Sequence, residues 1–210
     1  MGRCVIFGAA EFDSLLFPIA EDDCLIAADG GVRHLKTIGA QADLVLGDFD
    51  SLGYVPEGAA VFPVKKDDTD VMLALREGLK LGHREFLIYG GLDGKRLDHT
   101  VANFQALHFL RSRGARGYLV GKDYLVTVIS EETASFPATA DGVISLFCMG
   151  KEATGVGIEG LQYELENGTL NWDFPLGVSN HFIGKPSKIT VGSGMLLLMW
   201  DAKNGLPAVY

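Results

Sequence analysis

Short apolar runs alternate with longer polar and amphipathic segments from residue 3 to about residue 122 of the chain. The runs are rich in branched and aromatic side chains: Cys4–Phe7, Cys24–Ala27, Leu44–Leu46, Val61–Val64, Phe86–Tyr89 and Tyr118–Val120. Continuous apolar strands separated by helices are typical of a parallel sheet that is covered on both faces. The pattern therefore predicts an α/β N-terminal domain with a mainly parallel, Rossmann-like sheet.

Two of the segments between these runs carry helix signals. The first begins at Asp67–Asp70, which supplies caps and first-turn acids, and it ends at Gly82. The second begins near Asp98 and ends at Gly114. Its predicted apolar face consists of three residues: Val101, Phe104 and Leu107. Two amphipathic helices of this kind are what an α/β domain needs to cover its sheet.

The helical pattern disappears after about residue 130. Four short strand-like runs follow, separated by glycine, asparagine and proline turns: Ile144–Phe147, Leu161–Leu165, Lys188–Val191 and Met195–Trp200. Closely spaced strands without helices predict a small, antiparallel all-β sandwich. We expect the turn-rich stretch Ser130–Asp141 to link two domains, an α/β domain at residues 1–130 and the β-sandwich at residues 131–210.

Composition and charge exclude several classes of protein. The chain is 48% hydrophobic, and its 18 basic and 27 acidic residues give a net charge of −9 without any run of Lys or Arg. This argues against nucleic acid as a partner. The three cysteines, Cys4, Cys24 and Cys148, are too widely spaced to indicate a disulfide framework or a zinc site. The N-terminus has no cleavable signal pattern and the apolar runs are too short to span a bilayer, so we expect a cytoplasmic protein with no membrane segment.

Acids, glycines and a few cations follow the predicted strands. The segments after the second to fifth runs are Asp29–Gly31, Asp48–Asp50, Lys65–Asp70 and Gly90–Asp98. Ligands of a parallel sheet bind at this edge, and carboxylates held together there repel one another unless a cation shares the site. Because Mg²⁺ takes one or two carboxylates and completes its shell with phosphate oxygens and water, the pattern suits a nucleoside triphosphate with Mg²⁺. Lys95 or Arg96 would then neutralise charge on the transferred phosphorus.

Each of these features also has a purely structural interpretation. Asp48 and Asp50 match an ordinary turn with capping acids, and Gly30 matches a tight turn. Asp70 matches a first-turn acid that the helix dipole favours, and Asp98 matches an N-cap. The same chemistry at four separate strand ends favours a shared ligand site over four unrelated turns.

Six segments of the chain together carry a family pattern. In the N-terminal part they are Ala28–Gly31, Gly47–Ser51, Asp68–Asp70 and Gly90–His99. In the C-terminal part they are Gly160–Leu165 and Gly177–Asn180. In order and spacing, and over nearly the whole chain, these segments resemble a thiamine pyrophosphokinase of the bacterial type.

The resemblance implies an activity and an organisation. The reaction is transfer of the terminal diphosphoryl group of ATP to the hydroxyl of thiamine, which gives thiamine diphosphate and AMP. The α/β domain would bind nucleotide and metal, and the β-sandwich would bind thiamine. The resemblance also implies a homodimer in which the thiamine site is shared between subunits.

The resemblance also assigns roles to residues of the N-terminal domain. Asp48, Asp50 and Asp70 would hold or surround Mg²⁺ and take part in catalysis. Thr69 and Arg96 would contact the ATP phosphates, and Arg96 would act on the transferred group.

The remaining predicted site residues come from both domains. Asp29, Gly30 and Asp98 lie in matching motifs and join the predicted nucleotide site. Ser179 and Asn180 would bind the thiamine pyrimidine.

Three details and two rival functions stay open at this point. The segment Gly94–Asp98 is one residue longer than in many relatives, so either Lys95 or Arg96 is the phosphate cation. Trp172 and Trp200 are candidates for stacking on thiamine, although a sandwich core suits both better. The aspartate that accepts the proton is not identified. A metal-dependent nucleotide phosphohydrolase would use the same acids, and a non-catalytic thiamine or nucleotide sensor would not need so many carboxylates.

Overall fold

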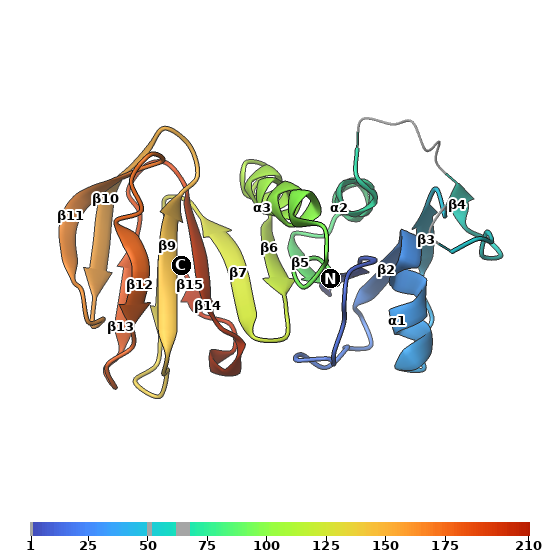
Figure 1. The fold of residues 1–210 in the computed structure, drawn as a ribbon, viewed down its shortest axis with the longest axis horizontal. Coiled ribbons are helices and arrows are strands. Elements are labelled where there is room, and N and C mark those ends of the chain that lie inside the picture. Colours follow the sequence, from blue (N-terminus) through green and yellow to red (C-terminus); the bar gives the residue numbers. More distant parts are fainter. Residues whose placement is uncertain (1, 50–51, 62–67) are drawn as a thin grey trace. The chain divides into compact units, whose positions relative to one another are not determined.

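The computed structural model describes residues 2–49, 52–61 and 68–210 of the chain (Figure 1). They form two compact units, Met1–Lys122 and Asp123–Tyr210. The sequence pattern places the boundary after residue 130, whereas the structure assigns β7 (Tyr124–Ile129) to the second unit. The reason is that β7 pairs along its whole length with β14 (Leu196–Asp201) of that unit.

The strands described in the first unit form a parallel sheet in the order β6–β5–β1–β2–β3–β4. Their bounds are β1 (Cys4–Phe7), β2 (Cys24–Ala28), β3 (Leu44–Gly47), β4 (Ala60–Val61), β5 (Glu85–Tyr89) and β6 (Arg116–Val120). Five of these strands coincide with predicted runs to within two residues at either end, whereas β4 shares only Val61 with the fourth run, whose residues 62–64 lie outside the described residues. The prediction of a mainly parallel sheet is confirmed.

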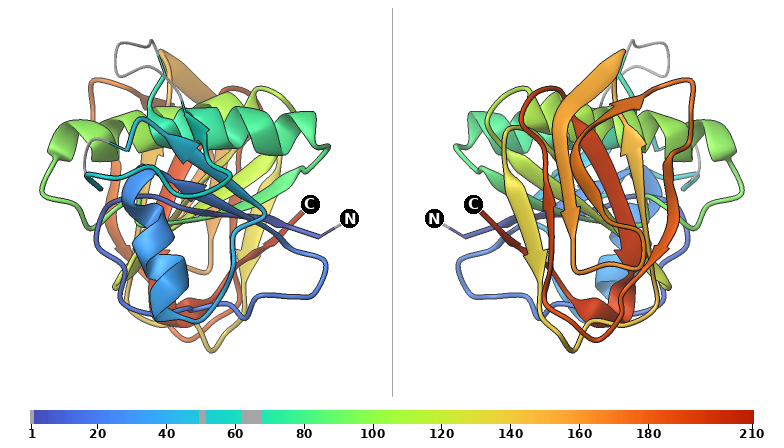
Figure 2. Two further views of the ribbon diagram at one scale, coloured as in Figure 1. Left: turned by 90° about the vertical axis from the view of Figure 1, so that its right-hand side faces the viewer. Right: turned by 90° about the vertical axis from the view of Figure 1, so that its left-hand side faces the viewer.

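Helices cover both faces of this sheet. Helix α1 (Val32–Thr37) lies on one face, and α2 (Asp70–Lys80) and α3 (Leu97–Arg111) lie side by side on the other (Figures 1 and 2). All four residues of the central strand β1 are buried as a result. The continuous apolar runs in the sequence thus have their physical cause in a sheet without a solvent face. None of the described helices is both long and apolar enough to cross a membrane.

The two predicted helices form, but one of them presents a different face. Thr69 caps α2 and Gly82 follows its end with a φ of 97°, as the sequence predicts. In α3 the predicted apolar face is right for Leu107, which is buried, but wrong for Val101, which is 49% exposed. The buried residues are Asn103, Ala106, Leu107 and Leu110. This face is chosen by packing on β6, where the missing side chain of Gly117 lets Leu107 and Leu110 approach the strand.

The strand order creates a switch point between β1 and β5. From β1 the chain adds β2, β3 and β4 in one direction and then crosses back to build β5 and β6 on the other side of β1. In such sheets the loops that leave the two strands at the switch point diverge and open a crevice at the carboxyl edge. The first unit therefore has one preferred place for a ligand, beyond the ends of β1 and β5.

The second unit contains two antiparallel sheets, with the strand orders β12–β9–β14–β7 and β11–β10–β13–β8–β15. The further strands are β8 (Thr133–Phe136), β9 (Val143–Cys148), β10 (Glu152–Glu159), β11 (Leu165–Asn171), β12 (Gly177–His181), β13 (Ser187–Thr190) and β15 (Ala208–Val209). Phe136 of β8 packs across the sheets on Trp200 of β14, with ring centroids 5.5 Å apart. This aromatic contact joins the two sheets, and the predicted β-sandwich is confirmed.

Two expectations for this unit are wrong in detail. Ser130–Asp141 is not a linker, because it contains β8, which pairs with β13 and β15. Leu161–Leu165 is not a strand, because Leu161 makes only an isolated bridge to Phe182 and β11 begins at Leu165. The positive φ of Gly160, 71°, turns the chain out of β10 at this point.

A buried carboxylate closes the loop between β1 and β2. Asp23 accepts hydrogen bonds from the side chain of Arg3, from the Arg3 amide (2.9 Å) and from the Ala20 amide (2.9 Å). Burial by itself would raise the pKa of Asp23, but the hydrogen bonds from Arg3 and Ala20 outweigh it and hold this pKa below its ordinary value of 3.8. The ionised form of Asp23 therefore stabilises the fold.

We expect Asp23→Asn to lower the free energy of unfolding by about 1.5–3 kcal/mol at neutral pH, the range for hydrogen bonds to a charged group. Because the folded pKa is depressed, this contribution is complete above the unfolded pKa and is lost as the pH falls through the folded pKa. Urea unfolding from neutral pH to about pH 2.5 measures it, with the exposed Asp22→Asn as control. A stability difference that stays constant over this range would contradict the assigned role.

Candidate active site

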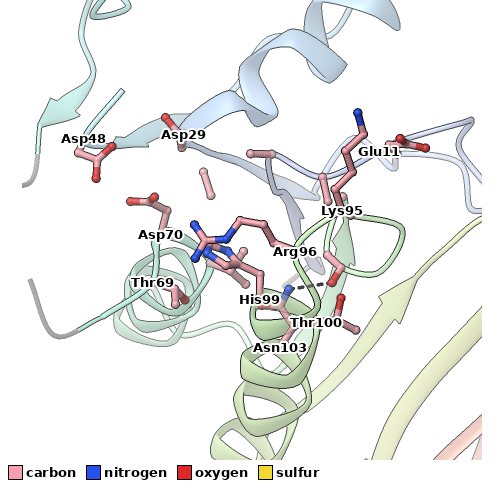
Figure 3. A pocket seen from close by; sticks show the side chains of 17 residues that line it. Glu11, Asp29, Asp48, Thr69, Asp70, Lys95, Arg96, His99, Thr100 and Asn103 are labelled. Atoms are coloured by element: carbon pink, nitrogen blue, oxygen red, sulfur yellow. Dashed lines mark hydrogen bonds between the residues drawn. The ribbon is translucent and has the colours of Figure 1, made fainter. Parts of the chain in front are cut away.

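A cavity of about 480 Å³ lies at the carboxyl edge of the parallel sheet, at the switch point (Figure 3). Its walls come from the loops after β1, β2, β3 and β5 and from the first turns of α2 and α3. The lining residues are Ala9, Ala10, Glu11, Ala28, Asp29, Asp48, Thr69, Asp70, Val71, Gly90, Gly91, Gly94, Lys95, Arg96, His99, Thr100 and Asn103. Parts of the chain that are far apart in sequence thus meet in one concave site.

Carboxylates gather at one end of this cavity. Asp29, Asp48 and Asp70 come from the ends of β2 and β3 and from the first turn of α2, and Figure 3 shows their side chains at the same end. Asp29 is only 6% exposed. Gly47 permits this approach, because a Cβ there would lie 3.0 Å from the Asp29 backbone. Asp50 lies outside the described residues.

The backbone beside two of these acids has unusual dihedral angles. Asp29 has a φ of 48° and Phe49, which follows Asp48, has a φ of 58°. Residues other than glycine adopt this region at a cost and do so mainly where the surrounding structure holds them. Phe49 is held because its side chain is buried in the core, which turns Asp48 toward the cavity. The strain lies at the strand ends that line the site.

The N-terminus of α2 forms a second part of the wall. The Thr69 hydroxyl accepts a hydrogen bond from the Met72 amide (3.2 Å) and so caps the helix. Its own hydrogen remains available as a donor. The helix N-terminus favours negative charge, which suits both Asp70 and an anionic ligand. The N-cap interpretation of this segment and a ligand role for Thr69 are therefore compatible.

Two cations face the cavity from the loop before α3. The Arg96 guanidinium donates from Nε to one oxygen of Asp98 (3.2 Å) and from Nη2 to the other (2.6 Å). These hydrogen bonds raise the pKa of Arg96 and lower the pKa of Asp98. In Figure 3 the Arg96 guanidinium points toward the end of the cavity that holds Asp70, whereas Lys95 points toward Glu11. Asp98 lies outside the cavity lining, and the N-cap residue of α3 is Arg96.

The glycine pair after β2 has a packing role. A Cβ on Gly31 would lie 1.7 Å from the Phe7 carbonyl oxygen, so only glycine allows η1 (Asp29–Gly31) to pass so close to β1. Gly30 is buried in η1 and is not among the cavity residues. For this pair the structure supports the tight-turn interpretation.

The sequence analysis missed the wall residues Ala9–Glu11, Thr100 and Asn103. The Asn103 amide nitrogen donates to the Gly91 carbonyl (2.8 Å), and the Thr100 hydroxyl donates to the Leu92 carbonyl (3.2 Å), so α3 holds the loop after β5 (Figure 3). One signal was that Ala9–Glu11 follow the first predicted strand, just as the acids and glycines follow the second to fifth. A second signal was the spacing of Asn103 on α3, three residues after Thr100 and four after His99, which places side chains on one side of a helix.

The predicted thiamine contacts lie in the second unit. Asn180 is 3% exposed, and its side-chain amide donates to the Tyr163 carbonyl (2.7 Å) and accepts from the Tyr163 amide (3.0 Å). Ser179 is exposed, has a φ of 59°, and its amide donates to the Ser145 hydroxyl (3.0 Å). Asn180 therefore fixes the backbone of Tyr163, whose ring is 60% exposed.

The tryptophans separate into two environments. Trp200 is fully buried in the sandwich core, as expected. The expectation is wrong for Trp172, which is 70% exposed because it lies in the turn that follows β11, beyond the reach of the core.

Comparison with protein families gives two matches. Residues 18–119 match the family model described as thiamin pyrophosphokinase, catalytic domain, and residues 130–196 match that described as thiamin pyrophosphokinase, vitamin B1 binding domain. The two models follow one another along the chain and together cover most of it. The chain belongs to the thiamin pyrophosphokinase family.

Solved structures of thiamin pyrophosphokinases share the fold over almost the whole chain. The Bacillus subtilis enzyme is 21% identical with a TM-score of 0.82, and the alignment covers 95% of this chain and 99% of that one. The Geobacillus thermodenitrificans structure is 22% identical with a TM-score of 0.80, and the alignment covers 98% of this chain and 100% of that one. The Candida albicans structure is 11% identical with a TM-score of 0.74, and the alignment covers 95% of this chain and 89% of that one. A comparison with curated proteins gave no match.

A metal site is not complete within the described residues. No group of three His, Cys, Asp or Glu side chains in residues 2–49, 52–61 and 68–210 is arranged to hold a metal ion. The cavity does present carboxylate oxygens from Asp48 and Asp70 beside a helix N-terminus. This donor set fits Mg²⁺, which needs few protein ligands when phosphate and water supply the others.

Proposed function

We propose that the cavity at the sheet edge is the nucleotide site of this thiamine diphosphokinase. The enzyme transfers the terminal diphosphoryl group of ATP to the hydroxyl of thiamine and releases AMP, the activity of the family to which the chain belongs. The observation that carries the proposal is the convergence of Asp29, Asp48, Asp70 and Arg96 in one cavity at the switch point. Carboxylates together with a cation in one cavity suit a metal-bound polyphosphate.

The phosphates are bound by groups that face the cavity. The N-terminus of α2 offers its dipole and the Thr69 hydroxyl, and Gly90 and Gly91 let a phosphate approach the backbone of the loop after β5. Arg96 supplies the cation. Lys95 also lines the cavity, but Arg96 lies on the side of Asp70 and is the better candidate (Figure 3).

In our proposal, Asp98 holds the Arg96 side chain in place. It pairs with the Arg96 guanidinium through both carboxylate oxygens and lies outside the cavity lining. A planar guanidinium held along one edge by two hydrogen bonds has fewer rotamers and is preorganised for phosphate. We therefore assign Asp98 to positioning Arg96 and not to direct nucleotide contact.

Asp48 and Asp70, together with Asp50, would hold Mg²⁺. When bound, Mg²⁺ would neutralise charge on the diphosphoryl group and orient it. The chain itself contributes a shaped cavity, which keeps the polyphosphate in place for in-line attack by the thiamine hydroxyl. A carboxylate at this end of the cavity accepts the proton of that hydroxyl as the bond to phosphorus forms and AMP leaves.

The corner formed by Ser179, Asn180 and Tyr163 is the proposed thiamine contact. Asn180 fixes the Tyr163 backbone through two hydrogen bonds, and the exposed Tyr163 ring is a flat surface on which a pyrimidine can stack. Tyr163 and Asn180 also line a small cavity of about 90 Å³. The aromatic partner of thiamine is then Tyr163 and not Trp200, which is buried.

We further propose that the enzyme is a homodimer whose thiamine site is shared between subunits. The segment after β11 and the start of β12 together expose four apolar side chains, Trp172, Phe174, Leu176 and Val178. An apolar group of this kind marks a surface for another protein, and a second copy of the chain is the partner implied by the family resemblance. The cytoplasmic location and the lack of a nucleic-acid partner stay predictions from the sequence.

The test of the activity is to incubate the protein with ATP, Mg²⁺ and thiamine and to separate the products. We expect AMP and thiamine diphosphate in equal amounts, and no turnover when a chelator removes Mg²⁺. Nucleotide consumption without thiamine would instead support the phosphohydrolase, and binding without turnover the sensor. ADP with thiamine monophosphate would contradict the proposed reaction.

A further inference from the structure

The loop after β1 forms one wall of the cavity with its backbone. Ala9 and Ala10 line the site from this side, and Gly90, Gly91 and Gly94 line it from the loop after β5. Because these residues have small side chains or none, a ligand against this wall meets main-chain atoms. The exact path of the backbone therefore determines the fit of the ligand.

Ala10 is held from both sides. Its amide donates to the Gly90 carbonyl (3.1 Å), which joins the loop after β1 to the loop after β5. Its carbonyl is 2.8 Å from Nε2 of His34 in α1. A carbonyl oxygen can only accept, so Nε2 of His34 must carry the hydrogen. The His34 side chain, from the helix on the other face of the sheet from α3, thus holds the Ala10 backbone. Ala10 also packs closely on Gly94, because a Cβ on Gly94 would lie 3.0 Å from the Ala10 Cβ.

His34 is itself fixed by aromatic packing. Its ring lies 5.2 Å from that of Phe12, and Phe12 in turn packs edge-on against Phe7 and Tyr89 at the ends of β1 and β5. The imidazole is half-buried and is not among the cavity residues. It therefore acts on a ligand only through Ala10.

We infer that His34 is a positioning residue of the nucleotide site, which sets the Ala9–Glu11 backbone for ATP. The inference rests on the proposed nucleotide site and adds a residue that does not touch the ligand. The Ala9–Glu11 wall lines the same cavity as Thr69 and Arg96, the proposed phosphate-binding residues. A displacement of this wall should therefore weaken the binding of ATP. The proposed thiamine contacts are in the second unit, so we expect the binding of thiamine not to depend on His34.

The experiment compares three replacements of His34 with a matched histidine elsewhere. His34→Gln keeps an amide nitrogen near the position of Nε2, whereas His34→Asn is one carbon too short and His34→Leu has no donor. We expect His34→Asn and His34→Leu to raise the KM for ATP about three- to tenfold, the effect of losing one hydrogen bond. The kcat and the KM for thiamine should stay within about twofold, and His34→Gln should restore the wild-type KM.

His83→Leu is the control. His83 is buried and its Nδ1 is 2.8 Å from the Gly2 carbonyl, so it makes the same kind of bond away from the cavity. Its replacement should lower the melting temperature without changing the KM for ATP. If His34→Leu fails to fold, the Asn and Gln pair decides, since the two differ by one methylene.

Two results would overturn the inference: an unchanged KM for ATP in His34→Asn, or equal KM changes in the His34 and His83 variants. Direct titration with ATP and Mg²⁺ gives a readout that does not need turnover. If wild-type protein binds ATP but makes no thiamine diphosphate, the proposed function fails. The ATP affinities of the His34 variants still test the positioning role in that case.

Discussion

Replacing Asp48 with asparagine is expected to abolish nearly all thiamine diphosphate formation while leaving the fold intact. Asn keeps the shape of the side chain and removes a charged, hard oxygen ligand from the acidic end of the cavity. We expect kcat to fall by roughly 10²-fold or more, the scale for losing electrostatic stabilisation of a transition state. The melting temperature should stay level or rise, because repulsion with Asp29 and Asp70 is relieved.

Steady-state kinetics and thermal unfolding of the same preparations measure both effects. Asp50→Asn should behave in the same way if this residue shares the metal. Glu57→Gln removes one exposed carboxylate of the first unit that is not on the cavity, and it should change neither quantity. An Asp48→Asn enzyme with wild-type kcat would remove Asp48 from the site, and a large drop in melting temperature would point to a structural role.

Two inactive variants are expected to restore activity when their subunits exchange. Asp48→Asn damages the proposed nucleotide site in the first unit, and Tyr163→Ala removes the exposed ring from the proposed thiamine corner in the second. In the proposed dimer, each site combines the first unit of one chain with the second unit of its partner. In a heterodimer of the two variants, one site therefore contains both substitutions and the other contains neither. Activity should then return to at most about half of wild type per heterodimer.

The measurement needs heterodimers that are proven by two different affinity tags. Each variant alone, carried through the same exchange conditions, is the control. Heterodimers that stay inactive would mean that each chain builds its own site. The shared-site proposal would then be wrong, whether or not the protein is a dimer.

Local sequence patterns determined much of the first unit. The apolar runs from Cys4–Phe7 to Tyr118–Val120 became the parallel strands because a sheet covered on both faces demands apolar residues at successive positions. Thr69 capped α2 as expected because capping depends on the nearest residues only. Asp29, Asp48 and Asp70 were found as cavity residues because strand ends in a parallel sheet share one edge.

Other features of the site were decided by side-chain contacts that a motif does not specify. The sequence alone indicated neither that Asp98 binds Arg96 outside the cavity nor that Asn180 is committed to the Tyr163 backbone. Both side chains lie in family motifs, and a motif does not say which of its polar atoms is used within the protein. The Asn180–Tyr163 hydrogen bonds join residues 17 positions apart and depend on how the folded chain brings them together, whereas the Arg96–Asp98 pair depends on the course of the loop before α3.

The strand order and the packing of α3 also depended on the tertiary structure. Local periodicity favoured an apolar face that includes Val101. In the structure Val101 is exposed, and Leu110 packs beside Leu107 on β6 because Gly117 leaves room for both. The crossing from β4 back to β5 put the loops after β1 and β5 next to each other, which local patterns do not encode. The sequence by itself thus determined which segments are strands and where their acids lie. Only the assembled sheet decided that Ala10, Gly90 and His34 meet, because that contact requires the backbone of three elements to be in place.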